Sequence, residues 1–403
     1  MGRFIVIILD GFGIGAMDDV PLTREMDIGS NTALNIIRKK PSIKLATLNR
    51  LGLMNAIGEE YKPHCFREMA NWGVANLTHF GADSFWGHQE IMGTLPKMPL
   101  IQPFYEKIDE VEKCLSDHGY NVRRLGSEGE GQILVVNDCM TVGDNLETDA
   151  GHNYNVTGCF DLISFDKLKE AGRLVRETVQ VSRVIAFGGE KVSLNDLIGA
   201  MQVKKNKIAG IDAPMSGVYR NGYQVVHLGY GVDPNVQIPT ILDKAGIHVA
   251  LFGKAADVIQ TSSPNVFYGV DTDMLFDKLL REMQSIPRGF FCLNIQETDL
   301  AGHIGDIDRY ADRLELCDRR IAEFLPYLAD GDILIITADH GNDPTIGHSN
   351  HTREKVPVLV YSSGVWGKRI GERNSLADIG ASAADYFKVC PTQHGISFLK
   401  ALT

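Results

Sequence analysis

The sequence predicts an α/β protein with a doubly wound, mainly parallel sheet, and three observations lead to this fold class. Short apolar runs rich in Ile and Val recur along the chain, which is typical of strands that are buried on both faces of a parallel sheet. Amphipathic stretches of helical periodicity lie between these runs, and this alternation is the pattern of α/β folds. The chain has 403 residues, which is more than one hydrophobic core usually spans, so we expect two domains.

The predicted strands are the continuous apolar runs, and the predicted helices are amphipathic stretches between them. The strands are expected at residues 4–9, 184–187, 249–252, 290–295, 333–336 and 358–361. The helices are expected at residues 271–284, 306–328 and 376–387. Ser375 precedes the last of these helices and is its expected N-cap.

The middle of the chain has a different pattern. Two helical candidates, residues 104–118 and 165–180, are separated there by glycine-rich turns and short strands, several of them amphipathic. We therefore expect residues 101–232 to form a smaller, inserted α+β domain. Residues 1–100 and 233–403 are then expected to form the core domain.

The charge of the chain bears on its partners. Its 40 Lys and Arg residues face 51 Asp and Glu residues, which gives a net charge of -11. No general positive field exists to attract a nucleic acid or an anionic membrane, so neither is expected as a partner. An acidic protein that handled phosphate would have to collect positive charge locally, and bound metal ions would supply it.

The apolar runs and the cysteines indicate the cellular compartment of the protein. The apolar run at residues 4–9 is too short for a signal peptide and ends at Asp10 rather than at a small-residue cleavage site. No apolar run approaches the length that a transmembrane helix needs. The seven cysteines form no C-x-x-C pair, which fits reduced thiols in the cytosol. We therefore interpret the protein as cytoplasmic.

Polar residues that follow two of the predicted strands are candidates for a site. Asp10 follows the run at residues 4–9, and carboxylates at the carboxyl ends of parallel strands lie where open α/β sheets bind ligands. Taken alone, Asp10 fits a turn aspartate better, and the following G-F-G-I-G does not match a dinucleotide loop. Asp299 and His303 follow the run at residues 290–295, and a helix would turn both toward one point. A capped helix start would explain this second pair equally well.

Two further clusters lie between the last two predicted strands. Asp339 and His340 come directly after the run at residues 333–336, and residues 348–354 (HSNHTRE) include His351. A buried, unpaired carboxylate is costly, and a metal ion would remove that cost. The candidate ligands from all four clusters are Asp10, Asp299, His303, Asp339, His340 and His351.

This ligand set predicts two divalent metal ions. Mixed nitrogen and oxygen ligands suit Mn, Zn or Fe rather than Ca. Six protein ligands are too many for one catalytic metal that keeps an open position. Paired metals about 3.5–4 Å apart are the usual device for holding a phosphoryl group in transfer.

Ser84 is the candidate nucleophile, in the polar segment of residues 81–93 (GADSFWGHQEIMG). Bound cations would lower the pKa of its hydroxyl, and a following helix would add backbone N–H donors for a phosphate. Alternatively, Asp83 or Ser84 caps a helix, and both interpretations can hold together.

At these residues the chain resembles the phosphopentomutases, within the alkaline phosphatase superfamily that also includes cofactor-independent phosphoglycerate mutase. The resemblance runs nearly end to end and is strongest at residues 8–16 (ILDGFGIGA), 87–93 (GHQEIMG), 339–344 (DHGNDP) and 351–354 (HTRE). It implies an alkaline-phosphatase-like core whose inserted domain is a cap over the substrate. It also implies that Ser84 bridges two Mn-type ions and carries the phosphoryl group during turnover.

The resemblance further assigns individual ligands and substrate contacts. One ion would be held by Asp10, Asp339 and His340, and the other by Asp299, His303 and His351. The residues that it points to as substrate contacts are His88, Arg220, Lys254 and Arg353. An exposed lysine at a strand end explains Lys254 equally well.

Several positions depart from the phosphopentomutase pattern. Ser84 stands where the family has threonine, and Gln89 stands where it has tryptophan. The spacing from Asp299 to His303 is one residue shorter and is that of phosphoglycerate mutases. Phe187 stands where the family has a cap arginine that binds the far phosphate of a pentose phosphate, and losing a bidentate phosphate partner is not conservative. This departure argues against ordinary pentose 1- and 5-phosphates as substrates.

The leading hypothesis is a phosphomutase that moves a phosphoryl group through phospho-Ser84 on a small phosphorylated metabolite of the phosphosugar type. The alternative is a metal-dependent phosphatase or phosphodiesterase at the same site, because an altered cap would admit water. A third hypothesis is a non-catalytic metal-binding protein. Retention of every candidate ligand and of a serine nucleophile speaks against it.

Overall fold

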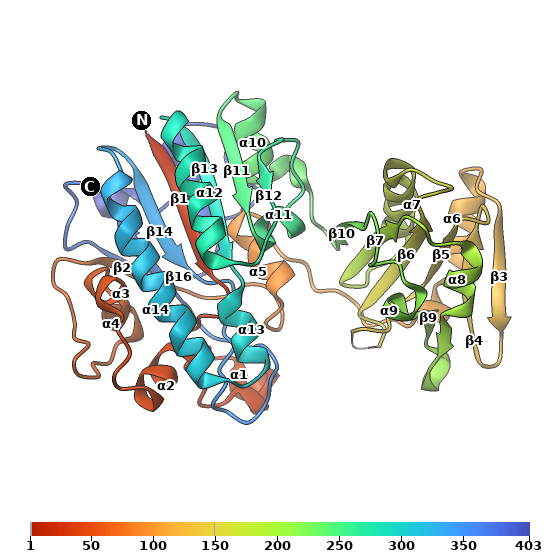
Figure 1. Cartoon of the computed structure of the whole chain (residues 1–403), viewed down its shortest axis with the longest axis horizontal. Coiled ribbons are helices and arrows are strands. Elements are labelled where there is room, and N and C mark those ends of the chain that lie inside the picture. The colour runs from red at the N-terminus through yellow and green to blue at the C-terminus, as the bar shows by residue number, and fades with distance from the viewer. Residues whose placement is uncertain (1, 149) are drawn as a thin grey trace. The chain divides into compact units, whose positions relative to one another are not determined.

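A computed structural model describes residues 2–148 and 150–403 of the chain. These residues form two compact units (Figure 1). The core unit consists of the chain up to Pro96 together with Asp233–Thr403, and the inserted unit is Lys97–Val232. The core unit is therefore built from both ends of the chain.

The core unit contains an eight-stranded sheet in the order β12-β11-β13-β1-β14-β15-β2-β16. Its strands are β1 (Arg3–Leu9), β2 (Asn71–Ala75), β11 (His248–Phe252), β12 (Val266–Phe267), β13 (Gly289–Ile295), β14 (Ile333–Thr337), β15 (Val356–Tyr361) and β16 (Arg369–Arg373). Neighbouring strands pair in parallel, except that β15 runs antiparallel to both β14 and β2. The predicted α/β class with a mainly parallel sheet is confirmed.

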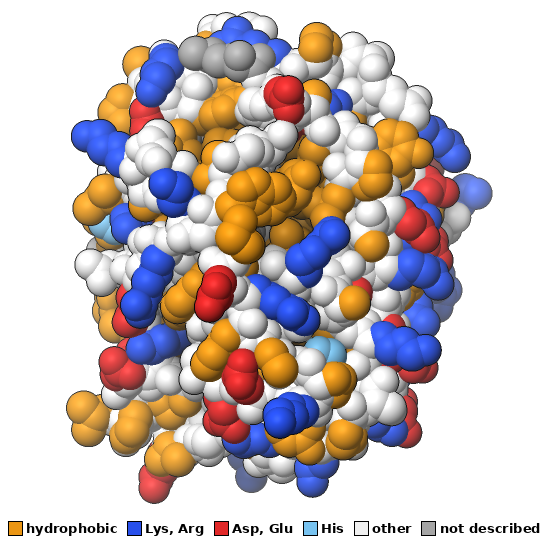
Figure 2. Space-filling model, turned by 90° about the vertical axis from the view of Figure 1, so that its left-hand side faces the viewer, with side chains coloured by type: hydrophobic (Ala, Val, Ile, Leu, Met, Phe, Trp, Pro, Cys, Tyr) orange, Lys and Arg blue, Asp and Glu red, His pale blue; other side chains and the backbone are white. Residues whose placement is uncertain are grey.

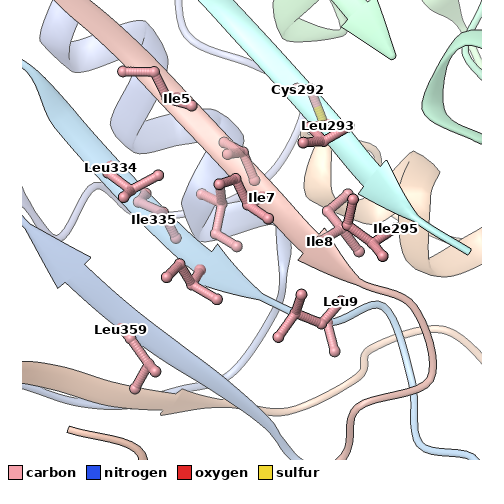
Figure 3. Packing of buried hydrophobic residues seen from close by; sticks show 14 of the residues in the cluster. Ile5, Ile7, Ile8, Leu9, Cys292, Leu293, Ile295, Leu334, Ile335 and Leu359 are labelled. Atoms are coloured by element: carbon pink, nitrogen blue, oxygen red, sulfur yellow. The ribbon is translucent and has the colours of Figure 1, made fainter. Parts of the chain in front are cut away.

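Strand β1 lies at the centre of the core because every one of its residues is buried. Ile7 pairs in register with Leu293 of β13 and with Ile336 of β14, so branched side chains meet across three adjacent strands (Figure 3). Burying one such side chain contributes about 1.5–3 kcal/mol. Because β1 is covered on both faces, its sequence is apolar from Phe4 to Leu9, and the next residue, Asp10, is polar and falls at the edge of the sheet.

Helices cover this sheet, and Figure 1 shows α12 and α14 in front of it. The helices of the core unit are α1 (Val20–Thr23), α2 (Thr32–Lys39), α3 (Ala46–Arg50), α4 (Leu53–Ile57), α5 (Ser84–Ile91), α10 (Ile238–Lys244), α11 (Lys254–Val258), α12 (Thr272–Ser285), α13 (Glu297–His303), α14 (Ile307–Phe324) and α15 (Ala377–Phe387). Asp271 and Asp306 cap α12 and α14, because their carboxylates accept the N–H groups of Met274 and Arg309.

Two predicted helix limits differ from the structure. The stretch expected at residues 306–328 leaves the α-helix after Phe324, because Pro326 has no N–H to continue it. Ser375 is not the N-cap of α15, which is Leu376. The hydroxyl of Ser375 instead donates to Glu90, 2.7 Å away, and accepts from the N–H of Ala377.

The inserted unit is an α+β structure around a six-stranded sheet in the order β10-β7-β6-β5-β4-β3. Its strands are β3 (Val122–Ser127), β4 (Gly131–Val136), β5 (Met140–Asp144), β6 (Asn153–Cys159), β7 (Arg183–Gly189) and β10 (Gln224–Gly229), with a separate pair β8 (Met201–Val203) and β9 (Ala209–Ile211). Its helices are α6 (Ile108–Asp117), α7 (Phe165–Thr178), α8 (Leu194–Gly199) and α9 (Ala213–Ser216). Helices α6 and α7 share one buried apolar cluster with the sheet.

Short 3-10 turns complete the chain in both units. They are η1 (Glu25–Asp27), η2 (Phe104–Glu106), η3 (Lys205–Lys207), η4 (Pro234–Val236), η5 (Leu325–Tyr327) and η6 (Leu399–Leu402).

On the face that Figure 2 shows, charged side chains of both signs are interspersed, and apolar side chains gather near the middle. None of the helices in the described parts of the chain combines the length and the apolar character that crossing a bilayer demands.

Candidate metal centre and nucleophile

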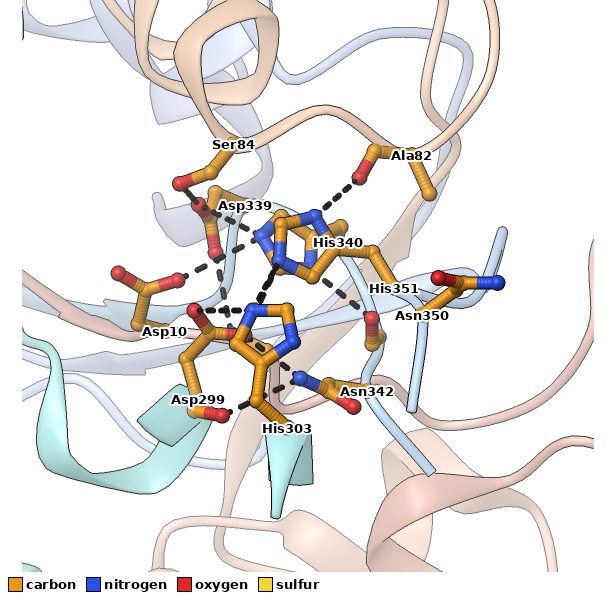
Figure 4. A network of polar contacts seen from close by, with 12 residues as sticks. Asp10, Ala82, Ser84, Asp299, His303, Asp339, His340, Asn342, Asn350 and His351 are labelled. Atoms are coloured by element: carbon orange, nitrogen blue, oxygen red, sulfur yellow. Dashed lines mark hydrogen bonds and ion pairs between the residues drawn. The ribbon is translucent and has the colours of Figure 1, made fainter. Parts of the chain in front are cut away.

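The candidate ligands meet at one edge of the core sheet (Figure 4). Asp10 directly follows β1, Asp339 lies two residues after β14, and Asp299 and His303 lie on α13, just after β13. Because these strands are parallel, their carboxyl ends share an edge. His351 precedes β15, and it reaches the same edge because β15 runs in the opposite direction.

Asp10, Asp339 and His340 form the first candidate group, with donor atoms that all lie within 4.8 Å of one another. Nε2 of His340 is 3.5 Å from Oδ1 of Asp10 and 3.3 Å from Oδ2 of Asp339. All three side chains are fully buried. Among the described residues, Oδ1 of Asp10 and Nε2 of His340 have no hydrogen-bond partner, although leaving buried polar atoms unpaired is costly. A cation between them would remove this cost.

Asp299, His340 and His351 form the second candidate group, again within 4.8 Å. His303 lies next to it, with Nε2 at 3.4 Å from Oδ2 of Asp299 and 2.9 Å from Nε2 of His351. The structure therefore brings all the predicted ligands together. It also places His340 close to both groups.

The three histidines present the same nitrogen to the site. Nδ1 of His340 lies 2.9 Å from the carbonyl of Gly341, and Nδ1 of His351 lies 2.8 Å from the carbonyl of Ala82. Nδ1 of His303 lies 2.9 Å from the carbonyl of Ser349. A carbonyl oxygen only accepts, so each Nδ1 carries a proton and each Nε2 faces the carboxylates. This backbone support is the usual way in which proteins orient histidines that bind metals.

The charges in the groups also call for a cation. Burial raises the pKa of Asp299, but the histidines at 303 and 351 and Lys254 outweigh it and hold the pKa well below its usual range. Burial lowers the pKa of His340, but Asp339 and Asp10 outweigh it and raise the pKa well above its usual range. The carboxylates thus draw positive charge to this edge. Carboxylates and imidazoles are suitable ligands for divalent transition metals, so the residues fit such an ion.

Ser84 is the first residue of α5, and it contacts the first group. Its hydroxyl donates to Oδ2 of Asp339 at a distance of 2.5 Å. The carboxylate of Asp83 caps the helix by accepting from the N–H of Trp86. The cap interpretation of this segment is confirmed, because the cap is Asp83. The serine hydroxyl lies at the helix N-terminus beside the candidate ligands, and its role as the nucleophile stays a prediction.

Lys254 lies inside the site rather than on an exposed strand end. Its Nζ is 2.9 Å from Oδ2 of Asp10 and 3.6 Å from Oδ2 of Asp299. Burial lowers its pKa, but the neighbouring carboxylates outweigh this effect and raise the pKa above its ordinary value. Its contact with a substrate stays a prediction. The same holds for Arg220, which lies in the inserted unit in the turn between α9 and β10.

Two of the expected substrate contacts, His88 and Arg353, are buried and bonded to the protein, and their contact with a substrate stays a prediction. His88 is fully buried, with Nδ1 at 2.8 Å from the carbonyl of Ser84 and Nε2 at 2.9 Å from Oδ1 of Asn294. Both ring nitrogens are thus engaged with the protein beneath the nucleophile. Arg353 is also buried, and each of its side-chain nitrogens donates to a protein oxygen.

Two asparagines that orient the carboxylates were not among the predicted site residues. The amide of Asn294 donates to Oδ2 of Asp10 at 2.9 Å, and that of Asn342 donates to Oδ1 of Asp299 at 2.8 Å. Asn294 interrupts an otherwise apolar strand, and this lone polar residue was the signal that could have revealed it. Asn342 lies in the Asp339–Asp343 cluster. The Asp and His residues of that cluster are better metal ligands than an asparagine, so the sequence did not single Asn342 out.

Comparison with known proteins identifies the family. A model of the metalloenzyme superfamily matches residues 2–391. The chain belongs to this metalloenzyme superfamily. The phosphopentomutase from Actinobacillus succinogenes is 30% identical to this metalloenzyme, over 99% of this chain and 100% of that protein. The phosphopentomutase from Shewanella pealeana is also 30% identical, over 99% of this chain and 100% of that protein. The chain is thus a member of the phosphopentomutase family, as its motifs suggested, and an enzyme of the phosphomutase type.

The solved structures that match this chain are less similar to it in sequence than these two phosphopentomutases. The PH0037 protein from Pyrococcus horikoshii aligns with a TM-score of 0.45 and 15% identity, over 96% of this chain and 97% of that one. Phosphoglycerate mutase from Leishmania mexicana aligns with a TM-score of 0.42 and 13% identity, over 98% and 97%.

Proposed function

We propose that this metalloenzyme moves a phosphoryl group between positions of a small phosphorylated metabolite of the phosphosugar type, by way of phospho-Ser84. The observation that carries the proposal is the position of the Ser84 hydroxyl, 2.5 Å from a carboxylate of the first ligand group and at a helix N-terminus. The relatives named phosphopentomutase support a sugar phosphate as the substrate class.

We further propose two divalent ions, of which manganese suits the mixed ligands. Asp10, Asp339 and His340 would hold one, and Asp299, His303 and His351 would hold the other. When bound, such ions supply positive charge that lowers the pKa of the serine hydroxyl and balances charge on the phosphoryl oxygens.

In the proposed reaction, Oγ of Ser84 attacks phosphorus while the bond from phosphorus to the substrate oxygen breaks, and the proton that the serine hydroxyl loses goes to the leaving oxygen, which becomes a hydroxyl. The carboxylate of Asp339 already accepts the hydroxyl hydrogen, which turns the lone pairs of Oγ away from that carboxylate. The phosphoryl group then passes from Oγ to another hydroxyl of the metabolite, and the serine is restored. We propose residues 101–232 as the cap that excludes water from this exchange.

One observation favours a second candidate, a metal-dependent phosphatase. Phe187 is 2% exposed and stacks on Tyr219 with ring centroids 6.0 Å apart. This position therefore holds a buried aromatic ring in place of the guanidinium that would bind a second phosphate. A cap that binds its substrate less tightly would let water accept the phosphoryl group.

Intact-mass measurement of manganese-loaded protein after incubation with a panel of sugar phosphates tests the proposal. We expect a gain of one phosphoryl mass on the parent protein and none on Ser84→Ala. An isomerised product would support the mutase, whereas release of inorganic phosphate alone would support the phosphatase. Absence of both phosphoryl uptake and phosphate release, with metal bound, would refute both functions.

A further inference from the structure

Arg353 is held in one place by a carboxylate. Its Nε lies 3.0 and 2.9 Å from the two oxygens of Asp19, and its terminal nitrogen Nη2 lies 2.9 Å from the second of them. The guanidinium is bound bidentately and the residue is only 6% exposed. Its orientation is therefore fixed by the core unit.

The other N–H groups of Arg353 bind the segment that leads to the nucleophile. This segment, residues 77–82, connects β2 to the N-terminal end of α5. Nη1 of Arg353 donates to the carbonyls of His79 and Gly81, at 2.7 Å each, and Nη2 donates to the carbonyl of Leu77 at 3.2 Å. One side chain thus binds three alternate carbonyls of the segment.

A carboxylate binds the N–H groups of the same segment. Glu90 accepts from the N–H of Thr78 at 3.0 Å and from the N–H of His79 at 3.1 Å, and Nδ1 of His79 lies 2.8 Å from it. Glu90 is fully buried and lies on α5, the helix that begins with Ser84. Backbone groups of the segment are therefore paired with two fixed, charged side chains instead of with a strand or helix.

The segment is also connected to the second ligand group. Nδ1 of His351 donates to the carbonyl of Ala82, two residues before Ser84. His351 and Arg353 are two residues apart and bind successive parts of the segment. Residues 351–353 thus contain both a candidate ligand, His351, and the arginine that binds the segment before the candidate nucleophile.

We propose that Arg353 is a positioning residue, which places the Ser84 hydroxyl against the first ligand group by fixing residues 77–82. This inference rests on the proposed function of Ser84. Lysine would keep the charge but not the planar fork that reaches three carbonyls and a carboxylate. A displacement of about 1 Å at a reacting atom lowers a rate by about 10²-fold, so even a small relaxation of the segment would be measurable.

The test compares Arg353→Lys with Arg3→Lys as a matched control. Arg3 is 8% exposed and likewise binds one carboxylate and backbone carbonyls, but at the start of β1, the opposite end of that strand from the ligand edge. Hydrogen exchange of peptides that cover residues 77–84 reports the segment directly. The rate of phosphoryl uptake by Ser84, and the donor concentration that gives half of that rate, report the nucleophile.

In Arg353→Lys we expect amide exchange in residues 77–84 to accelerate by about ten-fold or more. Phosphoryl uptake should slow by about ten- to a hundred-fold while the half-saturating donor concentration changes by less than about two-fold, since positioning affects the reacting atom and not ground-state binding. Arg3→Lys should change neither. Unchanged exchange in Arg353→Lys, or equal losses in Arg3→Lys, would overturn the proposal.

A second variant keeps the test decisive if Arg353→Lys does not fold. Asp19→Asn removes the anchor of the guanidinium, and this side chain is 40% exposed. It should show the same changes to a smaller extent, and no change would overturn the proposal. If wild-type protein takes up no phosphoryl group, the proposed function fails, and the exchange of residues 77–84 still decides whether Arg353 fixes the segment.

Discussion

The imidazole rings of His340 and His351 stack with their centroids 3.9 Å apart and an angle of 22° between their planes. His340 follows β14 and His351 precedes β15, and these two strands pair antiparallel. The stacking therefore places His340, which belongs to the first group, directly against His351 of the second group. Nε2 of His340 lies close to the carboxylates of the first group and belongs by distance to the second as well.

Because His340 touches both groups, His340→Ala should lower metal binding at both. We expect the metal content after dialysis to fall from about two ions per chain to less than about one. Elemental analysis by mass spectrometry measures this ratio. His248→Ala is the control, since His248 lies at the start of β11 and pairs with Glu282 outside both groups. Retention of two ions by His340→Ala would contradict the assignment.

Asp339 belongs to the first group alone, so Asp339→Ala should remove one ion and spare the other. This substitution also removes the acceptor of the Ser84 hydroxyl. We expect phosphoryl uptake to fall by about 10²–10³-fold, as when one electrostatic partner of a reacting group is lost. Metal content and uptake are measured on the same sample. Full activity with stoichiometric metal in this variant would refute the role of Asp339.

The fold class was predictable because it follows from local patterns. Strands β1, β13 and β14 are buried on both faces, so each appears in the sequence as a continuous apolar run. The outer strands β2 and β16 were not predicted. Strand β2 alternates buried and half-buried residues, and β16 contains glycine and arginine, so neither produces such a run.

The candidate site was predictable only in part. Asp10 and Asp339 could be placed together, because the carboxyl ends of parallel strands share an edge. His351 was expected at the same edge from the spacing of its motif, but the reversal of β15 that places it there is not reported by any local pattern in the sequence. The resemblance implied Arg353 as a substrate contact. Its carbonyl acceptors lie 272 to 276 residues away, so only the folded chain reveals these contacts.

Lys254 partly replaces a cation in the metal-free protein, because its ammonium lies beside the carboxylates of Asp10 and Asp299. Lys254→Met should therefore destabilise the metal-free protein by about 3–5 kcal/mol, the usual cost of leaving a buried charge without its partner. Manganese would restore much of this loss by binding the same carboxylates. Thermal unfolding with chelator and with manganese measures the difference.

The control for this prediction is Lys355→Met. Lys355 pairs with Glu372, whose side chain is 53% exposed, and surface pairs of this kind contribute only about 0–1 kcal/mol. Its unfolding temperature should change little, with or without manganese. If Lys254→Met were equally destabilised in both conditions, the lysine would stabilise the fold by packing and not by charge.

Asp144, in the inserted unit, should make folding depend on pH. It ends β5, and its two oxygens accept the N–H groups of Phe104 and Ala209 at 2.9 and 3.0 Å. Burial raises its pKa from 3.8 to about 6. The folded state therefore binds the proton more tightly than the unfolded state, so this stabilisation is complete below about pH 4 and is lost as the pH rises through about 6. A shift of about two pKa units corresponds to about 3 kcal/mol.

The measurement is the difference in unfolding free energy between wild type and Asp144→Asn at several pH values. We expect the advantage of wild type to shrink by about 2–3 kcal/mol between pH 4 and pH 7, because the amide does not titrate. All three tryptophans lie in the core unit, so their fluorescence does not report the unfolding of the inserted unit. Urea-dependent hydrogen exchange of peptides from residues 97–232 reports it instead.

Asp196→Asn is the control, since the hydroxyl and N–H of Ser193 lower the pKa of that exposed carboxylate. Its difference from wild type should not shrink over this pH range, and a constant difference for Asp144→Asn would show that Asp144 stays ionised in the folded unit.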